Sequence, residues 1–396
     1  MNVLCVFGKY QYGDPSRGIG TEYVSFVPAL KRLGHEVIHF ESWNRKCYSN
    51  YAELNKALLT TVNREHPDVM LVVQLNYEIW LETLRIIQAA GDVATICWTT
   101  DDSFKYREVS RFIGSSYHVI TTTYPEALPM YHRDRIHSVL LTQWAANSEN
   151  LREPLAAKEC EYQVSFVGAA HGDRKERIAR LNDHGIGVSC FGYGWPSGPV
   201  AAEEIPQIMR KSIISLNFAN SKGQNQIKAR TFEVPGAGGF LLTEYAPGLE
   251  EFYSIGSEID VFFKTEELVK KTGYYLSHPE KRDLVARAGF QRTVREHTYE
   301  IRMKEVLDFA LSARDRYIAA NKKPVMYSFD KLDRAHRVGS VSRLLREIIV
   351  LPCVLIWGEE RGPRAARRLI FELSWRLFGK KTFTASGWPG RLFPEQ

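Results

Sequence analysis

The sequence lacks the features of a secreted, membrane-spanning or zinc-binding protein. Its 396 residues contain only six cysteines, and no two of them have the short spacing of a zinc site. The longest uncharged apolar run, Ile348–Trp357, is too short for a bilayer, which needs about 20 residues. The first residues, MNVLCVFGKY, show neither a basic region nor a cleavage site and are typical of a β-strand. We therefore expect a cytoplasmic protein with reduced cysteines in its core.

A basic surplus along the body of the chain is also missing. The formal net charge is +6, but residues 331–396 hold 13 Lys and Arg against 6 Asp and Glu. A nucleic-acid-binding protein would spread its positive charge over a groove or face of its folded body. The charge distribution therefore predicts no nucleic-acid partner.

Apolar strand-like runs alternate with helical segments through most of the chain. Val3–Phe7, Asp68–Gln74 and Val93–Thr99 are strand-like, and the pattern restarts at Tyr162–Val167 after a polar stretch at 147–160. Strand–helix–strand alternation predicts parallel sheets with right-handed crossovers. We expect an α/β protein with a first Rossmann-like domain at 1–150, a second at 151–310, and a crossover helix and basic helical tail at 311–396.

The tail carries apolar stripes at helical spacing. One comprises Val341, Leu344, Leu345 and Ile348, and the other comprises Ala366, Leu369, Ile370, Leu373 and Leu377. Arginines flank both stripes, and tryptophans lie nearby. Such helices lie on anionic membrane surfaces, or they pack their stripes against the protein itself. The sequence gives these two interpretations equal weight.

The most informative stretch is QNQIKARTFEVPGAGGFLLTE, residues 224–244. Lys228 and Arg230 precede a short helical segment that holds Glu233, and a glycine-rich turn and a strand follow. Two cations near a helix N-terminus suit phosphates, and a carboxylate one turn later suits ribose hydroxyls. A plain surface helix with a glycine-rich exit is the alternative.

Six elements in fixed order carry a family resemblance. They are KARTFEV, GAGGFLLTE, LEEFYSIGSEI, TEEL, YYLSHPEKR and HTYEIR. Together they resemble the C-terminal half of GT-B glycosyltransferases, and more narrowly the bacterial "glycosyltransferase group 1" domain of CgeB-like proteins. The resemblance is closest over 228–297 and extends loosely over 1–310.

The resemblance implies two Rossmann-like domains facing a cleft, with a nucleotide-diphosphate sugar as donor and no further cofactor. It implies that Glu233 binds the donor ribose and that Arg230, then Lys228, meets the diphosphate. Arg174, in the loop SFVGAAHGDR after Gly168, is implied as a second phosphate contact. Asn225 stands where the broader retaining family often has a second glutamate. An amide binds a sugar but cannot act as a base, so the stereochemical outcome stays open.

Three further places are candidates for binding. Gly168 ends a strand, and in FGYGW (191–195) Tyr193 or Trp195 either walls the nucleotide base or packs on the core. The loop at 8–22 lies after the first strand, where open α/β sheets bind ligands, so Arg17 and Gly18 are candidates for donor or acceptor contact. His297 begins a crossover helix, and we expect a structural role for it.

Asp101 and Asp102 follow the strand Val93–Thr99 after one residue, Thr100. A carboxylate there can act as the general base on an acceptor hydroxyl, or it can cap the next helix. We favour Asp101 as the base, which makes Asp101, Arg230 and Lys228 the predicted catalytic set. The pair does not form an Asp-x-Asp metal motif, so no metal ion is expected.

The sequence thus predicts a metal-independent glycosyltransferase of hexosyltransferase type. It would transfer a sugar to a saccharide or lipid-linked saccharide in bacterial surface glycan, polysaccharide or glycolipid synthesis, in the cytoplasm or peripherally at the inner face of the membrane through 331–396. A sugar-nucleotide epimerase and a non-catalytic nucleotide-sugar-binding scaffold are the alternatives. The donor base, the sugar and the acceptor are not fixed by the sequence.

Overall fold

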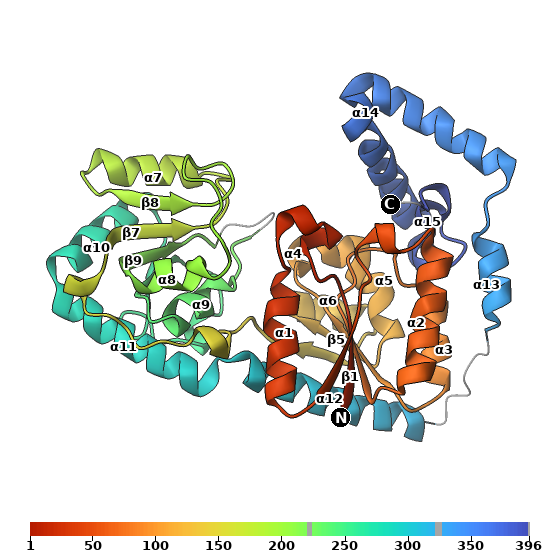
Figure 1. Ribbon diagram of the computed structural model, residues 1–396, viewed down its shortest axis with the longest axis horizontal. Coiled ribbons are helices and arrows are strands. Elements are labelled where there is room, and N and C mark those ends of the chain that lie inside the picture. The colour runs from red at the N-terminus through yellow and green to blue at the C-terminus, as the bar shows by residue number, and fades with distance from the viewer. Residues whose placement is uncertain (220–223, 321–326, 395–396) are drawn as a thin grey trace. The chain divides into compact units, whose positions relative to one another are not determined.

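The computed structural model describes residues 1–219, 224–320 and 327–394 (Figure 1). The chain forms two compact units: Met1–Thr142 together with Lys304–Gln396, and Gln143–Met303. The C-terminal part of the chain therefore belongs to the first unit. The sequence could not show this, because a helical stripe does not reveal what it packs against.

The first unit contains a six-stranded parallel sheet. Its strands are β1 (Asn2–Val6), β2 (Glu36–Phe40), β3 (Val69–Val72), β4 (Ala94–Trp98), β5 (Val119–Thr122) and β6 (Val139–Leu141). Their order is β2-β1-β3-β4-β5-β6. The chain adds β2 on one side of β1 and all later strands on the other side, so the topological switch point lies between β1 and β3. Open α/β sheets bind ligands at the carboxyl ends of the strands beside such a switch point.

Helices cover both faces of this sheet, which is why β3, β4 and β5 are buried along their whole length. The helices are α1 (Thr21–Arg32), α2 (Tyr51–Glu65), α3 (Leu81–Ala89), α4 (Asp102–Lys105), α5 (Arg111–Ile113), α6 (Ala127–Arg133) and α12 (Tyr299–Ala319). Between α4 and α5 the chain forms a π-helical turn, Tyr106–Ser110. Ser110 at its end donates a hydrogen bond to Asp102.

The tail comprises α13 (Phe329–His336), α14 (Ser340–Phe378) and α15 (Trp388–Leu392). α14 bends sharply at Gly358, where φ is 79°, into two limbs (Figure 1). The second limb packs on the first unit, where Phe371 joins the core and Arg368 forms an ion pair with Glu108 at 2.9 Å. The packing interpretation therefore holds for this limb.

The first limb of α14 exposes a row of large apolar side chains. This apolar limb comprises residues 344–357, and its exposed members are Leu344, Leu345, Ile348, Leu351, Leu355, Ile356 and Trp357. Leu355 is 79% exposed and Ile356 is 68% exposed. No helix in the described ranges is long and apolar enough to cross a membrane.

The second unit contains a five-stranded parallel sheet of order β11-β10-β9-β7-β8. Its strands are β7 (Tyr162–Val167), β8 (Val188–Phe191), β9 (Ser212–Asn217), β10 (Leu241–Glu244) and β11 (Asp260–Phe262). Its helices are α7 (Arg174–Asp183), α8 (Glu204–Arg210), α9 (Arg230–Gly236), α10 (Thr265–Ser277) and α11 (Pro279–Glu296). The switch point lies between β7 and β9. The prediction of two parallel-sheet halves with a helical tail is confirmed.

The cysteines are free thiols, and four of them are buried. Cys47 is exposed and Cys160 is half-buried, so the prediction that all six lie in the core was wrong for these two. Cys47 lies in a short 3-10 turn, Arg45–Cys47, outside the sheet.

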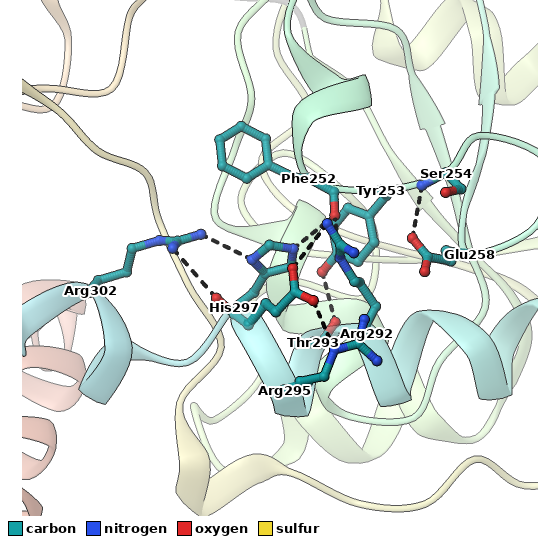
Figure 2. Close-up of polar contacts among 10 residues, drawn as sticks. Phe252, Tyr253, Ser254, Glu258, Arg292, Thr293, Arg295, His297 and Arg302 are labelled. Carbon is teal, nitrogen blue, oxygen red and sulfur yellow. Dashed lines mark hydrogen bonds and ion pairs between the residues drawn. The ribbon is translucent and has the colours of Figure 1, made fainter. Parts of the chain in front are cut away.

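His297 occupies a packed site at the end of α11 (Figure 2). Its Nε2 lies 2.8 Å from the carbonyl oxygen of Phe252, and Arg302 donates to its Nδ1 at 3.0 Å. Because Nδ1 accepts, Nε2 carries the hydrogen and the ring is neutral. Burial, with a smaller contribution from the neighbouring arginines, lowers the pKa of His297 to about 4. This arrangement is consistent with the structural role expected for His297.

Replacing His297 with glutamine should make the protein less sensitive to acid. Because the folded-state pKa lies below the usual value, the folded state binds fewer protons between about pH 6.5 and 4, and stability falls as the pH decreases through that window. The shift corresponds to about 3 kcal/mol at most. Melting temperatures at pH 7 and pH 4.5 should differ less for His297→Gln than for the wild type. The same change at exposed His184 should leave the difference unaltered.

Candidate functional site

The central pair of the site lies at the carboxyl end of the second sheet. Arg230 begins α9 and Glu233 follows one turn later. The Arg230 Nη1 donates to the Glu233 carboxylate, and its Nε donates to the Val167 carbonyl, at the end of β7, at 3.3 Å. Its Nη2 has no partner within 1–219, 224–320 and 327–394. Both side chains are about one quarter exposed, at 28% and 24%. Arg230 and Glu233 are thus held together at the switch point of the second sheet.

Lys228 adds positive charge to the same place. The pKa of His171, in the loop after β7, is lowered first by burial and then by the cations of Arg174 and Lys228. All three side chains therefore lie in one electrostatic neighbourhood. The structure brings the expected Lys228, Arg230 and Glu233 together near the loop that follows Gly168.

Arg174 is placed differently from a ligand-facing cation. It is 8% exposed, and it donates to the carbonyl oxygens of Ala169 at 3.0 Å and Phe218 at 3.4 Å. Burial lowers its pKa. Arg174 therefore ties the loop after β7 to the end of β9, and its guanidinium is engaged by the backbone.

A second ion-pair brace supports these loops, and sequence reasoning missed it. Arg177 Nη2 lies 2.9 Å from Glu244 and its Nε lies 2.7 Å from Asp173. Glu244, buried at the end of β10, also accepts the backbone N–H of Ala219 at 3.0 Å. The sequence offered one signal, because Glu244 ends an apolar strand and a buried carboxylate needs a partner.

The two aromatic candidates after β8, Trp195 and Tyr193, have different environments. Trp195 donates its Nε1 to the Gly168 carbonyl at 2.8 Å and packs edge-on against Phe166. Tyr193 is 61% exposed. A Cβ on Gly168 would lie 2.8 Å from the Phe166 ring, so this loop needs glycine there. Of the two aromatic candidates, Tyr193 is the one accessible to a base.

Asn225 donates its side-chain amide to the Tyr245 carbonyl at 2.9 Å. This bond links the segment before α9 to the loop after β10.

The loop at 8–22 in the first unit is folded by its own contacts. Arg17 pairs with Asp14 at 3.4 Å, and Gly18 has a φ of 80° that favours glycine. The Arg17 side chain is 49% exposed. Arg17 and Gly18 remain predictions as binding residues.

The two adjacent aspartates have different environments. Asp102 is 2% exposed and accepts hydroxyl hydrogens from Thr99, Ser110 and Tyr131 at 2.6 to 2.7 Å. Burial raises its pKa. Asp101 is half-buried and precedes α4 without a side-chain capping bond. Asp102 is therefore structural, and Asp101 remains the candidate base.

Glu22 is a candidate that the sequence did not reveal. It lies in the first turn of α1, half-buried, and burial raises its pKa. Asp101 raises that pKa further, and Lys105 opposes the rise. A carboxyl group whose pKa is raised by burial and by a neighbouring carboxylate is typical of acid–base sites. Only the fold brings α1 beside the end of β4, so no local motif could identify Glu22.

In the described part of the chain, no group of three or more His, Cys, Asp and Glu side chains is arranged to hold a metal ion.

Comparison with known proteins gives a consistent result. Residues 174–308 match the family model described as "Glycosyl transferase-like". A comparison with curated proteins finds no match. The sequence match therefore runs from α7 into the first half of α12, and it includes Lys228, Arg230 and Glu233.

Solved structures match over most of the chain. Sucrose-phosphate synthase from Thermosynechococcus elongatus matches with a TM-score of 0.55 and 10% identity, over 81% of this chain and 100% of that one. A glycosyltransferase from Rickettsia africae matches with a TM-score of 0.55 and 11% identity, over 79% and 98%.

HepE from Anabaena, solved in complex with UDP-glucose, matches with a TM-score of 0.51 and 10% identity, over 81% and 100%. At such identities these likenesses establish the fold. The narrower resemblance to CgeB-like proteins stays a prediction. The chain has the two-domain GT-B fold, and its residues 174–308 form a glycosyl transferase-like region.

Proposed function

We propose that this protein is a glycosyltransferase that moves a sugar from a nucleotide-diphosphate sugar to an acceptor hydroxyl. The observation that carries the proposal is the Arg230–Glu233 pair at the switch point of the second sheet, inside the glycosyl transferase-like region. HepE, with a similar fold, binds UDP-glucose, which supports a sugar nucleotide as donor.

In this mechanism the bond between the sugar C1 and the diphosphate oxygen breaks, and the acceptor oxygen bonds to C1. Negative charge grows on the leaving diphosphate. Arg230 and Lys228 offset that charge, the kind of term that usually contributes most to such transfers. Glu233 uses its second carboxylate oxygen to accept the ribose hydroxyls, and its bond to Arg230 keeps the guanidinium in place.

The supporting roles follow from the contacts. Arg174 and the Arg177–Glu244 brace position the loops around the diphosphate, which replaces the direct phosphate contact that we expected for Arg174. Tyr193 covers the nucleotide base, and Asn225 holds the sugar-side segment. Gly168 keeps the loop after β7 clear of the Phe166 ring, which a Cβ would approach to 2.8 Å. Transfer of hexosyl type would need neither a metal ion nor a further cofactor.

The acceptor proton goes to the carboxylates of the first unit, Asp101 or Glu22. We expect Glu22→Gln to lower kcat by about 100-fold. Because the folded-state pKa of Glu22 is raised, the rate of the wild type should fall as the pH drops through a value above 4.5. In the variant the rate should depend less on pH in this acidic range. A raised carboxyl pKa costs stability at neutral pH, so the variant should also melt at a higher temperature.

The matched control is Glu36→Gln at an exposed position on β2. It should change neither the pH–rate profile nor the melting temperature. An active Glu22→Gln variant with an unaltered acidic limb would assign the base to Asp101 alone.

We further propose a peripheral location at the inner face of a bacterial membrane, with a role in surface polysaccharide or glycolipid synthesis. The apolar limb supports this, since exposed apolar helix faces beside arginines insert at anionic interfaces. Deletion of 331–396 would not test it cleanly, because Phe371 and Phe383 belong to the core of the first unit.

Leu355→Glu should instead lower co-sedimentation with anionic vesicles by about tenfold, because burying one large apolar side chain contributes about 1.5–3 kcal/mol. Leu284→Glu, at a 62% exposed position on α11, is the control and should bind vesicles as the wild type does. Equal binding by all three proteins would rule out the apolar limb as the membrane contact.

The transfer activity itself is tested by incubating the protein with UDP-, GDP- and dTDP-sugars and a bacterial membrane fraction, and measuring the nucleotide diphosphate released. One donor should be consumed, and Arg230→Ala should slow the release by about 10²–10³-fold. Consumption of no donor by folded protein would contradict the proposal.

A further inference from the structure

The first unit has a cavity whose lining includes none of the donor-site residues. It has a volume of about 360 Å³, within the usual range for small-ligand sites. Its lining comes from the loops after β1, β2 and β3, including Tyr12, Trp43 and Tyr77, and from the second limb of α14. The cavity therefore lies at the switch point of the first sheet, where α/β folds bind ligands.

The cavity is strongly cationic. Arg45, Arg364 and Arg367 line it, and none of them has an ion-pair partner among the residues that the structure describes. Arg368, which also lines it, is neutralised by Glu108 and Glu372. The carboxylate of the lining, Glu78, accepts the backbone N–H groups of Leu75 and Asn76. Three guanidinium groups thus share one carboxylate in this lining, which leaves a surplus of positive charge around the cavity.

Two lining residues also have unused hydrogen-bonding groups. Arg45 donates its Nη2 to the Pro394 carbonyl at 3.2 Å, but its buried Nε and Nη1 have no partner in the described ranges. Ser42 is 0% exposed, and its Oγ is likewise without a partner there. Buried hydrogen-bonding groups without a partner are rare in folded proteins, so these groups call for a ligand.

Aromatic rings supply the rest of the lining. The Arg45 guanidinium stacks on the Tyr51 ring at 3.4 Å from its centroid. The ring centroids of Tyr51 and Tyr77 lie 5.4 Å apart, and those of Tyr77 and Phe371 lie 5.7 Å apart. Trp43 is fixed by its Nε1 bond to the Val73 carbonyl at 2.9 Å. Rigid aromatic faces beside guanidinium groups suit a ligand with a ring and an attached anion.

We propose that this cavity binds a phosphate-bearing saccharide through Arg45, Arg364 and Arg367. Its identification as the acceptor rests on the proposed function, whereas its binding does not. Two guanidinium groups come from α14, so the tail completes the site. The same helix exposes the apolar limb, which favours a phosphate attached to a lipid over a free sugar phosphate as the source.

The cavity lies close to the candidate base. Lys105, on α4, donates to the carbonyl oxygen of Leu75 in the lining at 3.3 Å. Lys105 also acts on the pKa values of both Glu22 and Glu78. A saccharide held by the arginines would therefore have its hydroxyls near Glu22 and Asp101.

The test is calorimetric titration of the full-length protein with glucose 1-phosphate, pyrophosphate and glucose. The first two should bind and glucose should not. Arg364→Gln combined with Arg367→Gln should weaken binding at least tenfold. Arg361→Gln, an exposed arginine on the same limb outside the lining, should leave it unchanged. The Glu233→Ala variant should bind glucose 1-phosphate as the wild type does, which separates this site from the donor site.

Vesicles carrying a polyprenyl-phosphate sugar identify the source of the phosphate. Stronger retention on them than on matched vesicles without it, lost in the double variant, would support a lipid-linked saccharide. Binding of glucose 1-phosphate alone would support a soluble sugar phosphate. The proposal is overturned if neither probe binds, if the double variant binds normally, or if UDP binds at these arginines as tightly as glucose 1-phosphate.

Discussion

Arg230→Ala should lower the rate of sugar transfer by about 10²–10³-fold while the protein stays folded. Removing one preorganised donor from a developing negative charge typically costs about 3–4 kcal/mol of transition-state stabilisation. Arg230 holds both the Val167 carbonyl and Glu233, so its loss also releases the ribose-binding carboxylate. The measurement is kcat and kcat/KM for the donor, together with the melting temperature.

Two control variants separate charge from geometry. Arg230→Lys keeps the positive charge but loses the planar guanidinium with its several N–H donors, so it should recover only part of the rate. Arg180→Ala, at an exposed position on α7, should have full activity. An Arg230→Ala enzyme within threefold of the wild-type rate would contradict the assignment of the diphosphate site.

Asp102→Ala should destabilise the first unit by about 3–4 kcal/mol, which is a large share of a typical domain's stability. It removes the common acceptor of Thr99, Ser110 and Tyr131 and leaves three buried hydroxyls to find other partners. Urea unfolding followed by tryptophan fluorescence would measure the loss.

Asp101→Ala is the adjacent control for this experiment. Because Asp101 is half-buried without a capping bond, its loss should cost well under 1 kcal/mol of stability, and it should lower the rate if Asp101 serves as the base. Equal destabilisation by the two variants would contradict the separation of their roles.

The features that the sequence revealed are local ones. The fully buried β3 and β4 were found because each is a short continuous apolar run. Lys228, Arg230 and Glu233 were found because all three lie within a few residues of one another around α9. Residues that are close in the sequence stay close in the folded chain, so their spacing predicts which of them lie together. Local spacing does not predict which distant residue a side chain will contact.

The features that the sequence missed depend on distant segments. Glu22 gains its environment from Asp101, and Arg177 gains its partner Glu244 from a strand far along the chain. The loop sequence predicts Arg174 as a phosphate contact, but it could not reveal the bond to the Phe218 carbonyl just after β9. The tail arginines gain a cavity only when α14 packs on the first unit.

The most direct test of the central claim is calorimetric titration of UDP, GDP, dTDP and CMP into the wild type and into Glu233→Ala. We expect one nucleoside diphosphate to bind, and we expect the variant to bind it about 100-fold more weakly, since two hydrogen bonds to a charged carboxylate contribute about 1.5–3 kcal/mol each. Binding that is unchanged in Glu233→Ala, or no binding of any nucleotide by the folded wild type, would contradict the assignment of this site as the donor site.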